Sequence, residues 1–143
     1  MDAASAVQVA VAFTWLGMVL AISFLEAPLK FRAPGITTAL GVGIGRLVFR
    51  ALNLSEAVLA VALLVTVALS WPPDPWWRVL PILGAVVVLV VGAGMLRPAM
   101  DARVRRGEVA DGRPRHGLHI GYVVLECLKA VLLLVIGVVG LAA

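Results

Sequence analysis

Charged side chains are scarce in this sequence, and their scarcity excludes an ordinary soluble domain. Only 14% of the 143 residues are charged, 62% are hydrophobic and the mean hydropathy is +1.07, whereas soluble domains are about a quarter charged. Most of the basic residues lie within residues 30–50 and 97–115, with long neutral runs between them. The sequence pI is near 10.2, but this arrangement argues against a nucleic-acid partner and indicates a bilayer.

Cysteine and histidine are almost absent, which limits the chemistry open to the chain. Cys127 is the one cysteine, so a disulfide-stapled secreted domain is excluded and a buried apolar thiol is expected. The histidines, His116 and His119, lie on or beside one predicted helix and cannot clamp a haem from two sides. No serine or cysteine is spaced with a histidine and an acid as nucleophilic catalysis requires.

Apolar runs long enough to cross a membrane are what the sequence has in abundance. Four windows cover about residues 7–26, 51–71, 79–96 and 118–141. With a rise of about 1.5 Å per residue, each can cross a hydrocarbon layer of about 30 Å. None shows the period-2 alternation of an outer-membrane strand. The sequence therefore predicts an all-α, polytopic membrane protein, a single domain built as a four-transmembrane-helix bundle.

Basic residues in the connections predict the orientation of these helices. The first connection and the approach to the second window hold four basic residues, the third connection holds six, and the middle one holds only Arg78. The first and third connections are therefore expected in the cytoplasm, beside anionic lipid, and both termini outside. Trp71, Trp76 and Trp77 cluster at the opposite boundary, which indole rings favour. Residues 1–6 hold no Lys or Arg, so the first window is not a cleaved signal peptide. We expect a multi-pass protein of the cytoplasmic membrane.

The residues ahead of the second window have a pattern of their own. Pro34-Gly35 is a turn signal, and Thr37 or Thr38 is a suitable helix cap. Apolar residues recur at helical spacing from Leu40, with basic residues off that stripe. We expect a short amphipathic segment at the cytoplasmic surface that continues or bends into the second span.

The third window ends at a proline. Pro98 lacks an N–H group and restricts the residue before it, so it marks the end of that span. Asp101 lies one turn further on and is expected to pair locally with Arg97 or Arg105 at the surface.

Several polar and ionisable residues nevertheless fall inside the predicted spans, where a charged one costs about 2.5 to 3.5 kcal/mol at mid-helix. In the second and fourth spans they recur at helical spacing and occupy one face of each helix. A shorter polar stripe ends the first span. Because the rest of each helix is apolar, the three stripes should face one another around an inward-facing polar pocket. Its predicted lining is Glu26, Arg46, Arg50, Asn53, Glu56, His119, Tyr122, Glu126 and Lys129.

Three functions fit such a pocket. The favoured one is binding or translocation of a small polar solute, ion or proton rather than catalysis. Glu56 and Glu126 would then titrate, and Arg46 and Arg50 would attract anions. A second is a redox enzyme that uses a bound quinone or divalent metal. A third is a structural or assembly subunit, in which Lys129 neutralises Glu126 and the stripes only fix helix register.

A metal centre is the sharpest form of the second alternative. Glu26, Glu56, His119 and Glu126 come from three helices and would offer three carboxylates and one imidazole. That ligand set suits iron, manganese or zinc. Against it, the Glu-x-x-His pairs of bundle di-metal sites are absent, and nearby cationic side chains would repel a metal ion.

The chain is small for a transporter at 15.0 kDa, so a homo-oligomer, most simply a homodimer, is expected. Two glycine pairs offer the small-residue surfaces on which membrane helices associate. They are Gly41 with Gly45, and Gly137 with Gly140.

Four short motifs support a resemblance to known membrane proteins. In order, they are Glu26-Ala27-Pro28-Leu29-Lys30-Phe31, Gly45-Arg46-Leu47-Val48-Phe49 with Glu56, Leu96-Arg97-Pro98 with Asp101, and Glu126-Cys127-Leu128-Lys129 preceded by His119. Over most of its length the chain resembles small uncharacterised bacterial four-helix membrane proteins with A-P-x-K-F, G-R-x-x-F, L-R-P and E-x-x-K signatures. It is more distantly similar to a four-helix membrane domain-of-unknown-function family, which has Asn in its final helix where this chain has Glu126. The resemblance implies a four-helix integral membrane fold and no particular activity.

Overall fold

A computed structural model of the chain describes residues 3–70, 74–106 and 116–142. Nearly all of these residues are helical, and no strand occurs among them. Four helical stretches are long and apolar enough to cross a membrane, which confirms the predicted all-α bundle. The elements, in chain order, are α1 (Ala3–Val19), η1 (Leu20–Glu26), α2 (Ala27–Leu29), η2 (Lys30–Arg32), α3 (Thr38–Leu69), α4 (Trp76–Val91), η3 (Gly92–Leu96), α5 (Arg97–Arg105) and α6 (His116–Leu141).

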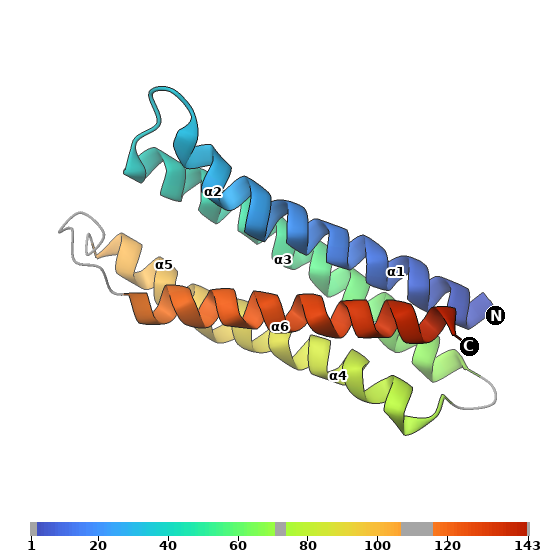
Figure 1. Cartoon of the computed structure of the whole chain (residues 1–143). Helices are drawn as coiled ribbons and strands as arrows, with labels where there is room; N and C mark the ends of the chain where they lie inside the picture. The colour runs from blue at the N-terminus through green and yellow to red at the C-terminus, as the bar shows by residue number, and fades with distance from the viewer. Residues whose placement is uncertain (1–2, 71–73, 107–115, 143) are drawn as a thin grey trace.

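The chain forms two antiparallel helical hairpins that lie against each other (Figure 1). The first hairpin joins α1, extended by η1, α2 and η2, to α3, and the second joins α4, extended by η3 and α5, to α6. Both termini lie at one end of the bundle, beside the last turn of α3 and the first turn of α4. The hairpins diverge toward the other end. We call this the open end, and the end with the termini the closed end.

The hydrophobic core fills the half of the bundle nearer the closed end. Trp15 of α1, Leu63 of α3, Ala85 of α4 and Leu133 of α6 are fully buried in one cluster. The outward faces of the same helices are also apolar, and Leu69, for example, has 76% of its surface exposed. An apolar exterior of this extent needs a non-aqueous surrounding, which a bilayer provides.

The predicted amphipathic segment is the first part of a single helix. α3 runs unbroken from Thr38 to Leu69 over 32 residues, or about 48 Å at 1.5 Å per residue. The Thr37 hydroxyl oxygen accepts a hydrogen bond from the Leu40 N–H at 3.2 Å, which confirms the predicted cap. Gly35 supplies the preceding turn with its φ of 78°. The segment therefore continues into the second candidate span rather than bending away from it.

The prediction that Pro98 ends the third helix was wrong. The helix continues to Arg105 because η3 is a stretch of π-helix, in which the Arg97 N–H donates to the Gly92 carbonyl five residues back. The wider turn moves the carbonyls that the proline ring would otherwise meet. The first hairpin also has a stretch of π-helix before a proline, since the Ala27 N–H donates to the Ile22 carbonyl just before Pro28.

The two glycine pairs expected at a dimer interface are used within the chain instead. A Cβ on Gly41 would collide with the Phe31 ring, and one on Gly45 would lie 3.0 Å from Lys30 Nζ. In α6, a Cβ on Gly137 would collide with Phe13 and one on Gly140 with Val9. The glycines therefore let the segments of α1 and η2 approach α6 and α3 closely. They are not free surfaces for a second copy.

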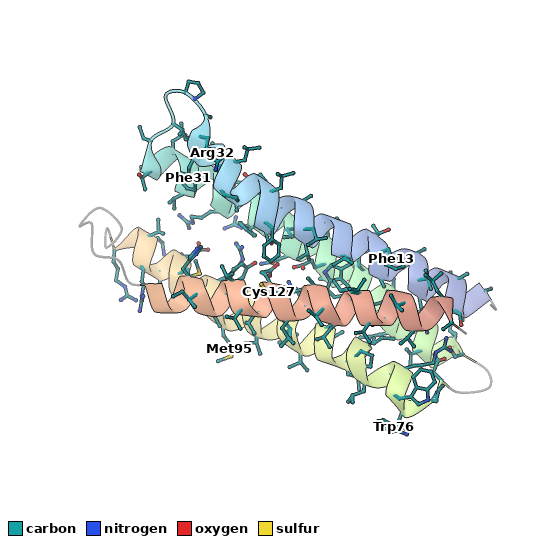
Figure 2. The ribbon with its side chains drawn as sticks, viewed as in Figure 1. Phe13, Phe31, Arg32, Trp76, Met95 and Cys127 are labelled. Carbon is teal, nitrogen blue, oxygen red and sulfur yellow. The ribbon has the colours of Figure 1, made fainter. Side chains whose placement is uncertain are left out.

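Other predictions concern the outer surface of the bundle. Cys127 was expected to be buried but is exposed on α6, because the neighbouring Glu126 points inward and successive helical residues turn by about 100°. Trp76 and Met95 point away from the bundle (Figure 2). Trp71, like Arg113 and Arg115, lies outside the described residues. The orientation of the helices in the membrane stays a prediction.

Candidate functional site

A buried ionic group lies at the centre of the bundle. The Lys129 ammonium on α6 donates to Glu56 Oε1 on α3 at 2.7 Å and to Glu126 Oε1 at 2.7 Å. All three residues are at most 2% exposed. α3 and α6 lie diagonally across the bundle, since each packs against α1 and α4, so Lys129 links the two hairpins. Figure 2 shows nitrogen and oxygen atoms gathered between them.

Three further side chains donate hydrogen bonds to these carboxylates. The Trp15 indole N–H donates to Glu56 Oε1 at 2.8 Å, and the Ser23 hydroxyl donates to Glu126 Oε2 at 2.8 Å. In the amide orientation that its neighbours favour, Asn53 donates to Glu56 Oε2 at 3.2 Å. The Asn53 oxygen then accepts from Arg97 Nε at 3.2 Å, so the network extends from Ser23 to Arg97.

Arg97 is held by neutral partners only. Its Nη2 and Nε donate to the Tyr122 hydroxyl at 2.9 and 3.3 Å. The guanidinium carbon lies 4.1 Å from the centre of the Phe49 ring and 4.7 Å from that of Tyr122, within the range of cation–π attraction. Among the described residues, no carboxylate lies within 4.0 Å of this guanidinium.

The local pair predicted for Asp101 is not formed. Its carboxylate instead accepts from Arg46 Nε on α3 at 2.9 Å, so it joins the two hairpins across the open end. Arg97 turns toward Tyr122 because the helix continues through Pro98 and carries the arginine into the bundle. A pair thought to be local is therefore a contact between hairpins.

A cleft of about 410 Å³ lies between the hairpins at the open end. Among the lining residues, Arg97 lies deepest on α5 and Glu126 lies deepest on α6, while His119 on α6 lies about 10 Å nearer the open end than Glu126, at 1.5 Å per residue. Much of the wall is aromatic or aliphatic. Those residues include Phe24, Phe31, Val42, Phe49, Met100 and Val104.

The nine predicted pocket residues fall into three groups. Four line the cleft: Arg46, His119, Tyr122 and Glu126. Three form the network behind it: Asn53, Glu56 and Lys129. Glu26 reaches the cleft only through Lys30, which lines it and lies 3.1 Å from the Glu26 carboxylate. Arg50 is exposed on α3 and is not part of the cleft lining.

Two residues of the site were missed by sequence reasoning. Trp15 sits in a largely apolar stretch with no charged neighbour in sequence, so it resembles an ordinary core aromatic residue. By sequence, Arg97 belongs with the arginines of the third connection, because Pro98 predicts the end of the helix there. The only sequence signal for its role is the motif Leu96-Arg97-Pro98, which has the same position in its hairpin as Glu26-Ala27-Pro28.

An internal repeat in the sequence does identify the two carboxylates. Residues 56–65 (EAVLAVALLV) and 126–135 (ECLKAVLLLV) match at six of ten positions. The same shift of 70 residues places Pro28 on Pro98. It also superposes the buried residues of α1 on those of α4: Ala12, Trp15 and Val19 on Ile82, Ala85 and Leu89. The hairpins are therefore equivalent halves, and Glu56 and Glu126 are equivalent carboxylates.

The described geometry does not support the metal hypothesis. No group of three or more His, Cys, Asp or Glu side chains among the described residues could hold a metal ion. The Lys129 ammonium occupies the space between Glu56 and Glu126. Glu26 is bound to Lys30, and His119 lies in the cleft wall away from the two buried carboxylates.

The closed end is tied by a second polar cluster centred on Asp74. Its carboxylate accepts from Gln8 of α1 at 3.0 Å, from Ser70 after α3 at 2.9 Å, and from Arg78 of α4 at 3.2 Å. Together with the hydrophobic core, these bonds hold three helix ends together. The cleft is thus accessible from the open end and sealed toward the closed end.

Comparison of the chain with protein-family models, with curated proteins and with solved structures gave no match. The resemblance to four-helix membrane families stays a prediction. The function is therefore argued from the geometry of the site.

Proposed function

We propose that this protein binds a small polar solute with an acidic group in the cleft and carries it across the cytoplasmic membrane. The observation that supports this most is Arg97, a cation in the cleft wall without a carboxylate partner among the described residues. A guanidinium is well suited to an acidic group, since its edge presents parallel N–H donors to two oxygens. Arg97 Nη1 donates to no described residue and is available for this contact.

The aromatic residues of the cleft wall fit the hydrocarbon part of such a solute. Phe24, Phe31 and Phe49 would contact its hydrocarbon part, while the acidic group would lie at the deep end of the space, beside Arg97 and Tyr122. Ligand sites in proteins commonly combine apolar walls with a few convergent polar groups. An aromatic acid is the simplest compound with both features.

The basic connections support a cytoplasmic location for the open end. Solute would then enter from the cytoplasm, or leave toward it. Passage through the bundle requires the closed end to separate, including the bonds of Asp74 to Gln8 and Arg78.

Benzenesulfonate is a suitable probe because it is aromatic and stays anionic. Its binding to the full chain in lipid nanodiscs is measured by calorimetry. Arg97→Gln should weaken binding about 10- to 100-fold, since hydrogen bonds to a charged group contribute about 1.5 to 3 kcal/mol. Arg50→Gln is the matched control, because Arg50 is an exposed arginine outside the cleft lining. Equal affinity in both variants would contradict the proposal.

Flux is measured with radiolabelled benzenesulfonate in proteoliposomes, with protein-free liposomes as the reference. The proposal predicts protein-dependent uptake that Arg97→Gln reduces and Arg50→Gln leaves unchanged. Binding without flux would support a receptor or enzyme rather than a transporter.

A structural role is favoured by one specific observation. Among the described residues, every buried side-chain nitrogen and oxygen has a hydrogen-bond partner. A satisfied ionic network can serve only to fix the register of helices. Absence of benzenesulfonate binding by the unmodified chain, together with a lower melting temperature for Arg97→Gln, would favour this alternative.

A further inference from the structure

The buried network is electrically balanced before any solute enters. Glu56 and Glu126 carry two negative charges, and Lys129 and Arg97 carry two positive ones. An anion bound at Arg97 would add one uncompensated charge beside Glu56, Glu126 and Lys129, which are at most 2% exposed. Such a charge is costly in a low dielectric unless a second charge neutralises it.

The side chains nearer the open end do not supply this compensation. Lys30 is paired with Glu26 at 3.1 Å, and Arg46 with Asp101 at 2.9 Å. Each pair is neutral as a unit, so neither offers an unpaired positive charge. Charge balance is most directly restored if an acidic group of the site takes up a proton.

The two equivalent carboxylates differ in their capacity to take up that proton. Glu56 accepts hydrogen bonds from Trp15, Lys129 and Asn53, and it does not line the cleft. Glu126 accepts only from Lys129 and Ser23, and it lines the cleft. Donors to a carboxylate favour its ionised form. Glu56 therefore has more donors and no access from the cleft, while Glu126 is the carboxylate that a proton from the cleft can reach.

The shift of 70 residues shows that the first hairpin's donors to the two carboxylates have no counterparts in the second half. The residues equivalent to Trp15 and Ser23 in the second half are Ala85 and Ala93, neither of which has a side-chain donor. The first hairpin thus supplies the indole to Glu56 and the hydroxyl to Glu126. Lys129 is also present in one half only, since its equivalent is Leu59.

We propose that binding of an anion at Arg97 is accompanied by uptake of one proton on Glu126, the carboxylate of the network that lines the cleft. This inference rests on the proposed function. The proton comes from the solution at the open end and forms an O–H bond on Glu126, and no other covalent bond changes. The titratable and charged groups around Glu126 are Lys129, Tyr122 and His119 of α6, Glu56 of α3 and Arg97 of α5.

The test is calorimetry of benzenesulfonate binding to the full chain in nanodiscs, in two buffers with different enthalpies of ionisation. The difference in binding enthalpy between the buffers gives the number of protons taken up per bound anion, through linkage. Because a sulfonate stays ionised, the proton must enter the protein. We expect uptake of about one proton near neutral pH.

Glu126→Gln should bind the anion and take up no proton. His119→Gln is the matched control in the cleft wall and should leave proton uptake unchanged. If Glu126→Gln does not fold, Ser23→Ala tests the same point, because loss of the hydroxyl donor favours protonated Glu126 and moves the uptake to higher pH.

Three outcomes would overturn the proposal. Binding by the unmodified chain without proton uptake would refute the coupling while leaving the proposed function intact. Loss of uptake in His119→Gln, with normal uptake in Glu126→Gln, would assign the proton to the histidine. Absence of anion binding would refute both the coupling and the proposed function.

Discussion

Replacement of Lys129 by leucine should destabilise the protein strongly. The change removes the ammonium that lies 2.7 Å from Glu56 and 2.7 Å from Glu126, and leaves two buried carboxylates facing each other. Removing one partner of a buried ion pair costs about 3–5 kcal/mol, and we expect the upper part of that range because both carboxylates lose their partner. For a chain of this size the melting temperature should fall by about 10–20 °C.

The assay is thermal unfolding of the purified protein in nanodiscs, followed by circular dichroism. Lys30→Leu is the control, since its pair with Glu26 is partly exposed and should contribute less than about 1 kcal/mol. A triple variant with Lys129→Leu, Glu56→Gln and Glu126→Gln should recover much of the lost stability, because it buries no charge at this position. A Lys129→Leu variant within about 1 kcal/mol of the unmodified chain, or a triple variant that recovers nothing, would refute the reasoning.

Two further substitutions test the packing and the hydrogen bonds around this network. Gly140→Leu should cost about 1–3 kcal/mol of stability, because a side chain there meets Val9 of α1. Gly43→Leu, where nothing lies within 4 Å, should change stability by less than about 0.5 kcal/mol in the same melting assay; equal effects would contradict the packing of α1 on α6. Trp15→Phe keeps an aromatic ring but removes the N–H donor to Glu56, and should cost about 1–3 kcal/mol in denaturant or thermal unfolding. No loss of stability in Trp15→Phe would show that the indole bond contributes little.

The candidate spans were predictable because apolarity over about 20 residues is a strong and local signal. The ends of the helices were less predictable from the sequence. Pro28 and Pro98 each follow a stretch of π-helix that lets the helix continue, and no residue pattern used in the sequence analysis distinguishes such a proline from one that ends a helix. The Thr37 cap was predictable, because a hydroxyl before a helix acts on its own neighbours.

The site was predictable in part for a related reason. Glu56, Glu126 and Lys129 lie mid-span, where apolar surroundings force polar groups together. Arg97 and Asp101 could not be assigned in the same way, because their partners lie on other helices, Tyr122 on α6 of the same hairpin and Arg46 on α3 of the other. Local spacing favours partners one turn away and contains no information on contacts between helices.

The number of helices in each repeat has a consequence for any transport cycle. Each half contributes two membrane crossings, an even number, so both halves enter the bilayer the same way up. A pseudo-twofold axis between them then runs along the membrane normal, unlike the in-plane axis of inverted repeats. In inverted repeats, an exchange of conformations between the halves converts an inward-facing state into an outward-facing one. Parallel halves lack that equivalence, so a transport cycle built on this fold would open the two faces by different movements.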